Sequence, residues 1–327
     1  MGTATGRDEL RAIARRAMIA RGLQPDFPVP ALAEADALGD RRVEEGALVR
    51  DLRDRPWISI DNDDSRDLDQ LSLTEPAACG ATRLLVAIAD VDTAVSPGGA
   101  IDTHARGNTT SVYTAPQVFP MLPERLSTDL TSLAEGQDRL ALVVEMTVDT
   151  SGAVGRSDLF RALVRNQAKL AYNAVAAWLE GRAPSPGASP APEVLEQLRL
   201  QDGVAQTMTV RRQQRGALTL GLTESRVVFE GDRLVDLRPE PKNRAQELIE
   251  DFMIAANVAT AHYLERRGFP TLRRVLRHPR AGAASSSWRR STASGCPAKP
   301  APPLCSRSSI GDAGPTPCAS RISRWRW

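Results

Sequence analysis

The sequence predicts an α+β, or mixed α/β, fold, because helix and strand patterns occur together without regular β-α alternation. The clearest strand signal is ESRVVFEGDRLVDLRPEP, residues 224–241, where apolar and polar residues alternate on both sides of a Gly231-Asp232 turn. The clearest helix signal is QELIEDFMIAANVATAHYLERRG, residues 246–268, which has an apolar face and ends at Gly268. A chain of 327 residues is long enough to bury a core around such elements.

The first 56 residues are predicted to form a helical N-terminal segment. Residues 7–23 place apolar side chains at helical spacing, with a glycine near the end as a stop signal. A second helix is predicted over residues 31–39, after a break made by two prolines.

Three strands are predicted in the middle of the chain. Residues 83–95 read as a buried strand with a polar exit, and residues 139–155 as a strand that enters a Ser-Gly hairpin turn. Residues 159–181 are strand-like at first and then helical up to Gly181, and residues 182–192 form a surface loop rich in Pro, Ser and Gly.

The composition is that of a soluble globular protein, with 42% hydrophobic and 25% charged residues. No stretch approaches the ~20 apolar residues of a membrane-spanning helix, and the N-terminus lacks the apolar core of a signal peptide. Metal-ligand spacing is absent from the four cysteines, Cys79, Cys296, Cys305 and Cys318. We therefore expect a protein of the reducing cytoplasm.

Residues 281–327 differ in character from the rest of the chain. They hold seven basic residues and one acidic residue, a charge of +6, so that residues 1–280 carry −4 within the net charge of +2. The main body is therefore not broadly basic, and any nucleic-acid binding there must use a local groove or a metal. Because the tail has neither helical nor strand periodicity, we expect it to be disordered.

Five aspartates crowd into residues 61–69, between the apolar segments 58–60 and 71–73. An acidic surface loop is the simplest interpretation, but apolar residues on both sides fix the segment against a core and bring the carboxylates together. A calcium loop counted from Asp61 fails, because Arg66 stands where glycine is needed and Ser72 where glutamate is needed.

A magnesium site for phosphodiester chemistry is the third interpretation. Mg²⁺ prefers hard oxygen ligands and keeps waters or substrate phosphate in its shell. Carboxylates of Asp61, Asp67 and Asp69 suit such a site, since Asp67 and Asp69 point the same way if the segment is extended, and Asp61 approaches across a bend.

At these residues the chain resembles a known family. IDNDDSRDLDQL is similar to the aspartate signature of the RNB family of exoribonucleases, which includes ribonuclease II and ribonuclease R. The resemblance continues through VAIADVDTAVSPGGAIDTHA, TSVYTAPQVFPMLPERLSTDLTSL, RGAL and the helix ELIEDFMIAANVATAHYL. It covers residues 57–280, which we interpret as a partial RNB catalytic domain, incomplete at its C-terminal side.

The resemblance implies a set of site residues. The family pattern of an Asp followed six residues later by Asp-x-Asp-Asp falls on Asp61, Asp67, Asp69 and Gln70, so a neutral amide replaces the fourth carboxylate. The first three would be catalytic and would hold Mg²⁺, with Gln70 as an auxiliary ligand. Tyr113 matches the aromatic residue that stacks on a base near the RNA 3′ end, and Leu220 stands where its phenylalanine partner is expected.

Other polar residues carry two interpretations. Asp90 and Asp92 either support the metal site from behind or end a strand, and Arg125 and Arg139 either meet phosphate or form structural ion pairs. The three histidines are scattered and none stands beside a nucleophile.

The tail receives a second interpretation from the resemblance. Reading the gene one base earlier converts residues 288–297 and 317–327 into segments that again resemble the family. We interpret residues 281–327 as the product of a frameshift; the alternative is a native basic tail that contacts RNA.

The implied activity is Mg²⁺-dependent hydrolytic 3′-to-5′ degradation of single-stranded RNA to 5′-mononucleotides, in the cytoplasm, with no membrane and no protein partner. Because the C-terminal side of the catalytic domain is missing, we expect weak or absent hydrolysis by this chain and marginal stability. The alternatives are a non-catalytic RNA-binding or regulatory remnant that keeps part of the groove, and an unfolded product.

Overall fold

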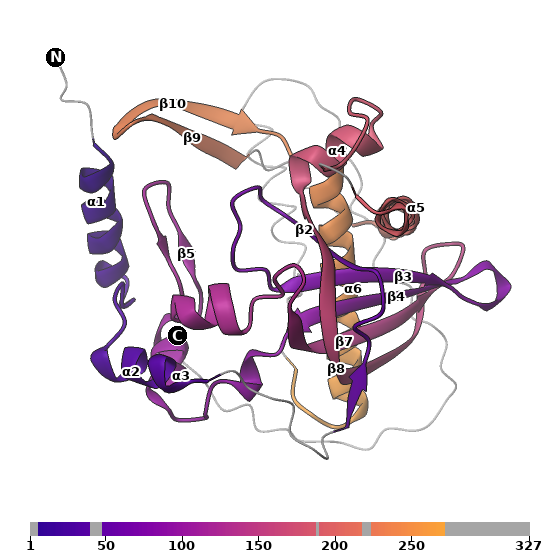
Figure 1. The fold of residues 1–327 in the computed structure, drawn as a ribbon, viewed down its shortest axis with the longest axis horizontal. Helices are drawn as coiled ribbons and strands as arrows, with labels where there is room; N and C mark the ends of the chain where they lie inside the picture. Colours follow the sequence, from indigo (N-terminus) through magenta and orange to yellow (C-terminus); the bar gives the residue numbers. More distant parts are fainter. Residues whose placement is uncertain (1–5, 40–47, 188–189, 218–223, 272–327) are drawn as a thin grey trace, which may run out of the picture. The chain divides into compact units, whose positions relative to one another are not determined.

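Helices and strands mix along the chain in the computed structural model, which confirms the predicted α+β class (Figure 1). The structure describes residues 6–39, 48–187, 190–217 and 224–271. The helices are α1 (Arg7–Ala20), α2 (Val29–Ala37), α3 (Ala100–Asn108), α4 (Tyr172–Leu179), α5 (Pro192–Gln214) and α6 (Arg244–Arg266). The strands are β1 (Val49–Asp51), β2 (Trp57–Asp61), β3 (Gln70–Pro76), β4 (Thr82–Ala89), β5 (Val112–Tyr113), β6 (Val118–Phe119), β7 (Asp138–Val148), β8 (Val154–Ala171), β9 (Glu224–Glu230) and β10 (Arg233–Glu240).

The main sheet has the strand order β1-β8-β2-β3-β4-β7 and closes on itself through β8. The first part of this 18-residue strand pairs antiparallel with β7 as far as Arg165, and the last part pairs in parallel with β2 from Asn166 onward. Because β7 is also the neighbour of β4, the pairings form a ring, β8-β2-β3-β4-β7-β8. Closure of this kind leaves few unpaired strand edges.

Strands β2, β4, β7 and β8 of the ring each contribute to two apolar clusters, and β3 contributes to one of them. Trp57, Leu71 and Leu85 belong to a cluster formed by the strands and by two loop residues, Leu68 and Leu133. Alternate residues point the other way and pack against the helices α4, α5 and α6, with Ile58, Ile60, Leu84, Val86 and Met146 among them. Burial on both faces explains why the strands read as nearly continuous apolar runs. Figure 1 shows α6 crossing the sheet.

Helix α5 is held to the sheet by polar side chains. Gln197 is buried and bonds Thr74 on β3 three times: its Oε1 accepts from the Thr74 amide at 2.8 Å and from the Thr74 hydroxyl at 3.0 Å, and its Nε2 donates to the Thr74 carbonyl at 2.8 Å. One turn later, Gln201 accepts a bond from Ser72 at 2.7 Å. The face of α5 that packs on the sheet is therefore partly polar. For this reason the sequence of α5 lacks the amphipathic pattern by which a helix is predicted.

We predict that Gln197→Leu lowers the free energy of unfolding by about 2–4 kcal/mol. The leucine fits the buried volume but leaves the Thr74 backbone amide, carbonyl and hydroxyl without partners in a dry site. Urea denaturation followed by circular dichroism measures the change. Gln213→Leu on the same helix is the matched control, because Gln213 is exposed and such a change alters stability by ~0.5 kcal/mol or less. Equal effects of the two changes would contradict the role given to Gln197.

The N-terminal helices are attached at both ends. At the start of α1, the Arg7 amide donates to the Asp232 carbonyl at 3.0 Å, and the Arg7 guanidinium lies over the Phe229 ring of the β9-β10 hairpin. On α2, Glu34 accepts from the amides of Ala100 and Ile101 at 2.6 and 3.1 Å and so caps α3. These contacts join α1 to the hairpin and α2 to α3, and all four elements belong to the same compact unit as the sheet.

Most predicted elements are confirmed: the helices of residues 7–23, 31–39 and 246–268, the strands of residues 83–95 and 139–155, the strand-to-helix segment 159–181 and the hairpin of residues 224–241. The elements that were not predicted are α3, α5, the strands β2, β3, β5 and β6, and β1, which lies in the segment expected to be helical. Among the described residues, no helix is both long and apolar enough to cross a membrane. The predictions for residues 281–327 and for Leu220 lie outside the described residues.

Candidate active site

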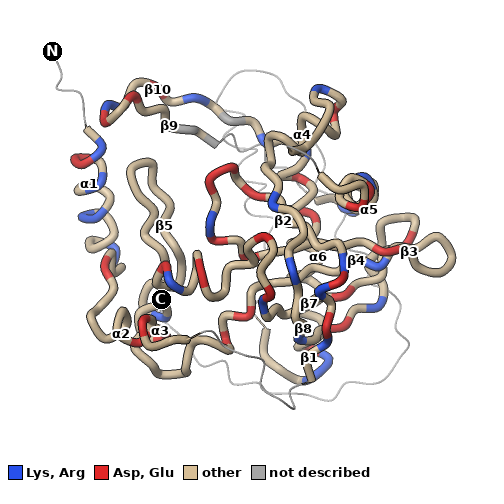
Figure 2. Tube along the Cα trace, in the orientation of Figure 1, with Lys and Arg blue, Asp and Glu red and all other residues tan. Residues whose placement is uncertain are grey.

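The five aspartates lie on the loop that joins β2 to β3, from Asp61 at the end of one strand to Asp69 just before the other. Figure 2 shows the acidic residues that line this loop. Its second half is anchored by Leu68, which is buried in the strand cluster. The Leu68 amide donates to the Ser132 hydroxyl at 3.2 Å, and the Leu68 carbonyl accepts from the Leu133 amide at 2.8 Å.

Burial of Leu68 places its two neighbours. Leu68 is buried, whereas Asp67 before it is half-buried and Asp69 after it is exposed, an alternation expected of an extended segment. The backbone continues into the sheet at once, since the Asp69 carbonyl accepts from the Ala89 amide of β4 at 2.9 Å. That Asp67 and Asp69 point the same way stays a prediction.

Asp61 is held by the first turn of the loop. Its Oδ1 accepts from the Asn62 amide at 2.7 Å and from the Ser65 hydroxyl at 2.8 Å. The Ser65 amide in turn donates to the Asn62 carbonyl at 3.2 Å and closes the turn. Two donors therefore fix one carboxylate oxygen of Asp61, and none of the described residues donates a hydrogen bond to the other.

Asp69 is the aspartate of this loop whose charged form is destabilised by its surroundings. Its pKa is raised, first because the surrounding protein desolvates the carboxylate and then because Asp61 and Asp67 add negative charge nearby. Solvent nevertheless reaches the residue, which is exposed, so the carboxylate lies in a recess rather than in the core. Among the described residues, only its own backbone amide bonds it, and its charge is uncompensated.

Tyr113 and Asp67 meet across the site. Tyr113, on the short strand β5, donates its hydroxyl to Asp67 Oδ2 at 3.2 Å and remains 68% exposed. Desolvation and the charges of Asp67, Asp69 and Asp61 raise the pKa of the phenol, which stays protonated. An exposed ring fixed at one edge beside the aspartates is free to accept a base on its face.

Tyr172 is a site residue that the sequence analysis missed. It begins α4, directly after Ala171, which pairs with Asp61 across the β2-β8 seam. Burial and the charges of Asp61 and Asp69 raise the pKa of Tyr172 to about 12, against a hydrogen bond with Gln70 that lowers it. Gln70 therefore lies next to Tyr172, and its role as an auxiliary metal ligand stays a prediction. In the sequence, the only feature that marks Tyr172 is its position where the predicted strand passes into a helix. That position indicates the site only when the pairing of β8 with β2 is known.

The donor set fits a hard divalent cation in charge and chemistry. Asp61, Asp67, Asp69 and Gln70 offer only oxygen donors, which Mg²⁺ prefers, and the Asp69 charge lacks a cationic partner among the described residues. As they stand, no three His, Cys, Asp or Glu side chains in the described part of the chain are grouped so that they could hold a metal ion. Repulsion between carboxylates opposes closer approach until a cation is bound.

The other candidates are structural. Arg161 on β8 pairs with Asp90 at 2.7 Å and with Asp92 at 3.1 Å, so both carboxylates are engaged at a strand end rather than on the aspartate loop. Arg125 binds the carbonyls of Ala35 and Leu38, and Arg139 those of Ser132, Asp138 and Asp129. These arginines use backbone carbonyls, where ion pairs or phosphate contacts had been predicted.

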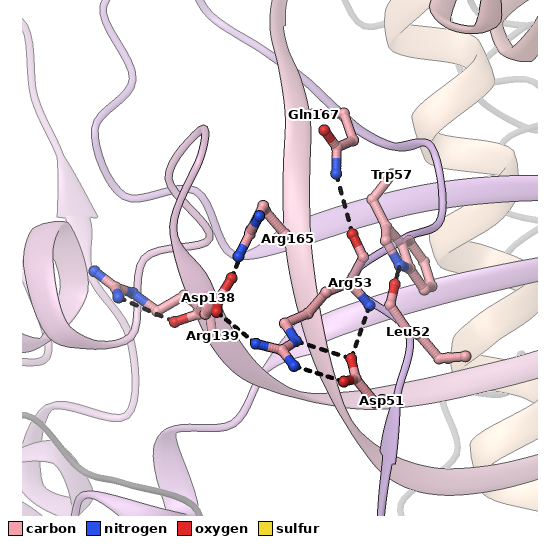
Figure 3. A network of polar contacts seen from close by, with 8 residues as sticks. All are labelled: Asp51, Leu52, Arg53, Trp57, Asp138, Arg139, Arg165 and Gln167. Carbon is pink, nitrogen blue, oxygen red and sulfur yellow. Dashed lines mark hydrogen bonds and ion pairs between the residues drawn. The ribbon is translucent and has the colours of Figure 1, made fainter.

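A separate polar network lies where β1, β7 and β8 meet. Figure 3 shows Arg53 joining Asp51 to Asp138, while Arg165 donates to the other oxygen of Asp138 at 2.6 Å. A cavity of about 560 Å³ is lined in part by Asp138, Arg139 and Arg165. None of the three predicted catalytic aspartates lines this cavity; of its charged groups, Arg165 binds Asp138 and Arg139 binds backbone carbonyls.

The chain belongs to the RNB family, since residues 49–294 match the RNB domain. It is 37% identical over 245 residues to ribonuclease R of Vibrio parahaemolyticus, and the aligned region covers 74% of this chain and 29% of that protein. It is also 37% identical over 232 residues to exoribonuclease 2 of Edwardsiella piscicida, which covers 69% of this chain and 35% of that protein.

A solved structure confirms the fold. The structure of Mycoplasma genitalium RNase R in complex with ribose methylated single-stranded RNA matches with a TM-score of 0.73 and 27% sequence identity, over 80% of this chain and 40% of that one. The chain spans about a third of the length of the curated relatives it matches.

We predict that Asp69→Asn stabilises the metal-free protein at neutral pH. The amide removes a desolvated charge that two neighbouring carboxylates repel. Because solvent reaches and screens the group, the gain is at most about 1 kcal/mol, or ~2–4 °C in Tm for a domain of this size. Thermal denaturation in the presence of a chelator measures it. Asp63→Asn is the control, because Asp63 is exposed on the same loop; a Tm that falls in Asp69→Asn alone would contradict the strain described.

Proposed function

We propose that this chain carries the catalytic aspartates of a hydrolytic 3′-to-5′ exoribonuclease, which acts on single-stranded RNA and releases 5′-mononucleotides with the help of Mg²⁺. The observation that carries the proposal is the set of three carboxylates on one anchored loop, open to solvent, with the Asp69 charge uncompensated. Membership of the RNB family and the likeness to ribonuclease R and exoribonuclease 2 support it. The similar structure of Mycoplasma genitalium RNase R holds single-stranded RNA, which supports RNA as the substrate of this chain.

Each side chain has a defined task in this proposal. Asp61, Asp67 and Asp69 would hold Mg²⁺, and Gln70 would add a neutral oxygen from the side of Tyr172. When bound, Mg²⁺ supplies an activated water and stabilises charge on the departing 3′-oxygen. The hydroxyl of Tyr113 orients Asp67, and its ring stacks on a base of the RNA, an interaction worth ~1–3 kcal/mol.

The second candidate function is a non-catalytic RNA-binding remnant. Two observations favour it: Gln70 replaces a carboxylate, and the described residues hold no closed group of three metal ligands. This candidate keeps RNA binding without turnover.

The test of the proposed function is the degradation of single-stranded RNA labelled at its 5′ end, with and without Mg²⁺. We expect slow, stepwise shortening from the 3′ end, in keeping with the weak hydrolysis expected of this chain, and a further loss of at least about 10²-fold in rate for Asp69→Asn, because a metal ligand is removed. Asp63→Asn removes the same charge from the same loop and should retain the rate. Binding of RNA without any shortening, equal in wild type and Asp69→Asn, would select the remnant instead.

We further predict that Tyr113→Ala weakens binding of a short single-stranded RNA by about 5- to 150-fold, the equivalent of ~1–3 kcal/mol of stacking. Tyr113→Phe keeps the ring and loses only the bond to Asp67, so it should bind RNA nearly as well as wild type. Fluorescence anisotropy with labelled RNA, in the presence of Ca²⁺ to suppress hydrolysis, measures both. Equal weakening in the two variants would assign the effect to the hydroxyl and refute stacking.

A further inference from the structure

Lys169 on β8 reaches from the sheet to the aspartate loop. Its ammonium donates to the Ser65 carbonyl at 2.5 Å, across 104 positions of sequence. The side chain is exposed, and no carboxylate of a described residue forms an ion pair with it. A carboxylate is a stronger partner for an ammonium than a backbone carbonyl is. Lys169 nevertheless binds a carbonyl in a loop that holds five aspartates, so the contact needs an explanation.

The backbone of Lys169 is fixed on both edges of β8. On one edge, Lys169 is paired with Ser59 of β2 in the parallel register. On the other edge, the Lys169 amide donates to Glu135 Oε2 at 2.9 Å. The ammonium is therefore presented to the loop from a rigid base, and it holds the loop relative to the sheet.

The contact is transmitted to Asp61 through one residue. Ser65, whose carbonyl Lys169 binds, donates its own hydroxyl to Asp61 Oδ1 at 2.8 Å. The turn formed by Asn62 and Ser65 is thus fixed at its far end by Lys169, and the second oxygen of Asp61 accepts no hydrogen bond from the described residues.

We propose that Lys169 is a positioning residue for the metal site: by binding the Ser65 carbonyl it sets the rotamer and orientation of Asp61. This inference rests on the proposed function, because it assigns Asp61 as a ligand of a divalent cation. Residues that orient a metal ligand in this way contribute about 10- to 100-fold to metal affinity when they are changed.

The sign of the effect separates positioning from simple electrostatics. A positive charge near a cation site repels the cation, so removal of the Lys169 charge alone would tighten metal binding. If Lys169 acts by positioning Asp61, its removal weakens metal binding instead. A purely structural contact would lower the Tm and leave metal affinity unchanged.

The experiment is a titration of the full chain with Mn²⁺, without RNA, in which electron paramagnetic resonance counts the free ion. We expect Lys169→Met and Ser65→Ala each to raise the Kd for Mn²⁺ about tenfold, and Lys169→Arg to restore most of the affinity because its guanidinium keeps a donor for the carbonyl. Arg156→Met is the matched control, since Arg156 is an exposed base at the far end of the same strand; it should leave the Kd within about twofold of wild type. Circular dichroism melts check that all variants fold.

The outcomes distinguish the inference from the function on which it rests. Unchanged or tighter Mn²⁺ binding in Lys169→Met, with wild type binding normally, overturns the positioning role alone. Absence of Mn²⁺ binding by folded wild-type protein overturns the metal-dependent function and the positioning role together. Weaker binding in Lys169→Met and Ser65→Ala, with Arg156→Met unaffected, supports both.

Discussion

Repulsion among carboxylates is the constraint on which this part of the molecule depends. Three aspartates on one short loop oppose their own assembly, and the pKa of Asp69 is raised first by desolvation and then by the charges of Asp61 and Asp67. The loop stays in place because other interactions outweigh it: the burial of Leu68, the two bonds of the Ser132 hydroxyl with the loop backbone, and the hold of Lys169 on the Ser65 carbonyl. Apolar burial and backbone hydrogen bonds thus keep together side chains that would separate if they were free.

The sheet supplies the rigid frame for this arrangement. β2 ends at Asp61, β3 begins at Gln70 and β8 carries Lys169, so the strands that border the loop are neighbours in one closed ring. Helices cover the outer face of the same strands, and the buried glutamines of α5 fix β3 from behind. A side chain placed on such a frame is held more firmly than one on a free loop, which a site built from repelling groups requires.

Much of the fold and part of the site followed from the sequence. Elements with a strong hydrophobic periodicity, such as α6 and the β9-β10 hairpin, were predictable because apolar residues recur along one face of each. Helix α5 was not, because Gln197, Gln201 and Asp202 lie on its buried side and hide the pattern. β1 was too short to carry a period, since it has only three residues.

The site divides in the same way. Asp61, Asp67, Asp69, Gln70 and Tyr113 were found because they share a local motif or a family pattern. Tyr172 and Lys169 were not predicted, because they reach the loop through the pairing of β2 with β8. The sequence of neither strand alone determines the register between two strands so far apart in the chain. The contact of Arg161 with Asp90 and Asp92 has the same origin, since it joins residues 71 and 69 positions apart.

The double pairing of β8 also bears on how the chain reaches its folded state. β7 and β8 form a hairpin between neighbours in sequence, whereas the β2-β8 seam joins residues more than a hundred positions apart, as in the bond from Asn166 to Ser59 across 107 positions. Contacts of such long range form late, because loop closure must come first. Until the seam forms, β2 and the end of β8 present unpaired edges that favour association with other chains. The same closure that brings Lys169 and Tyr172 to the aspartates therefore decides how long the newly made chain is exposed to aggregation.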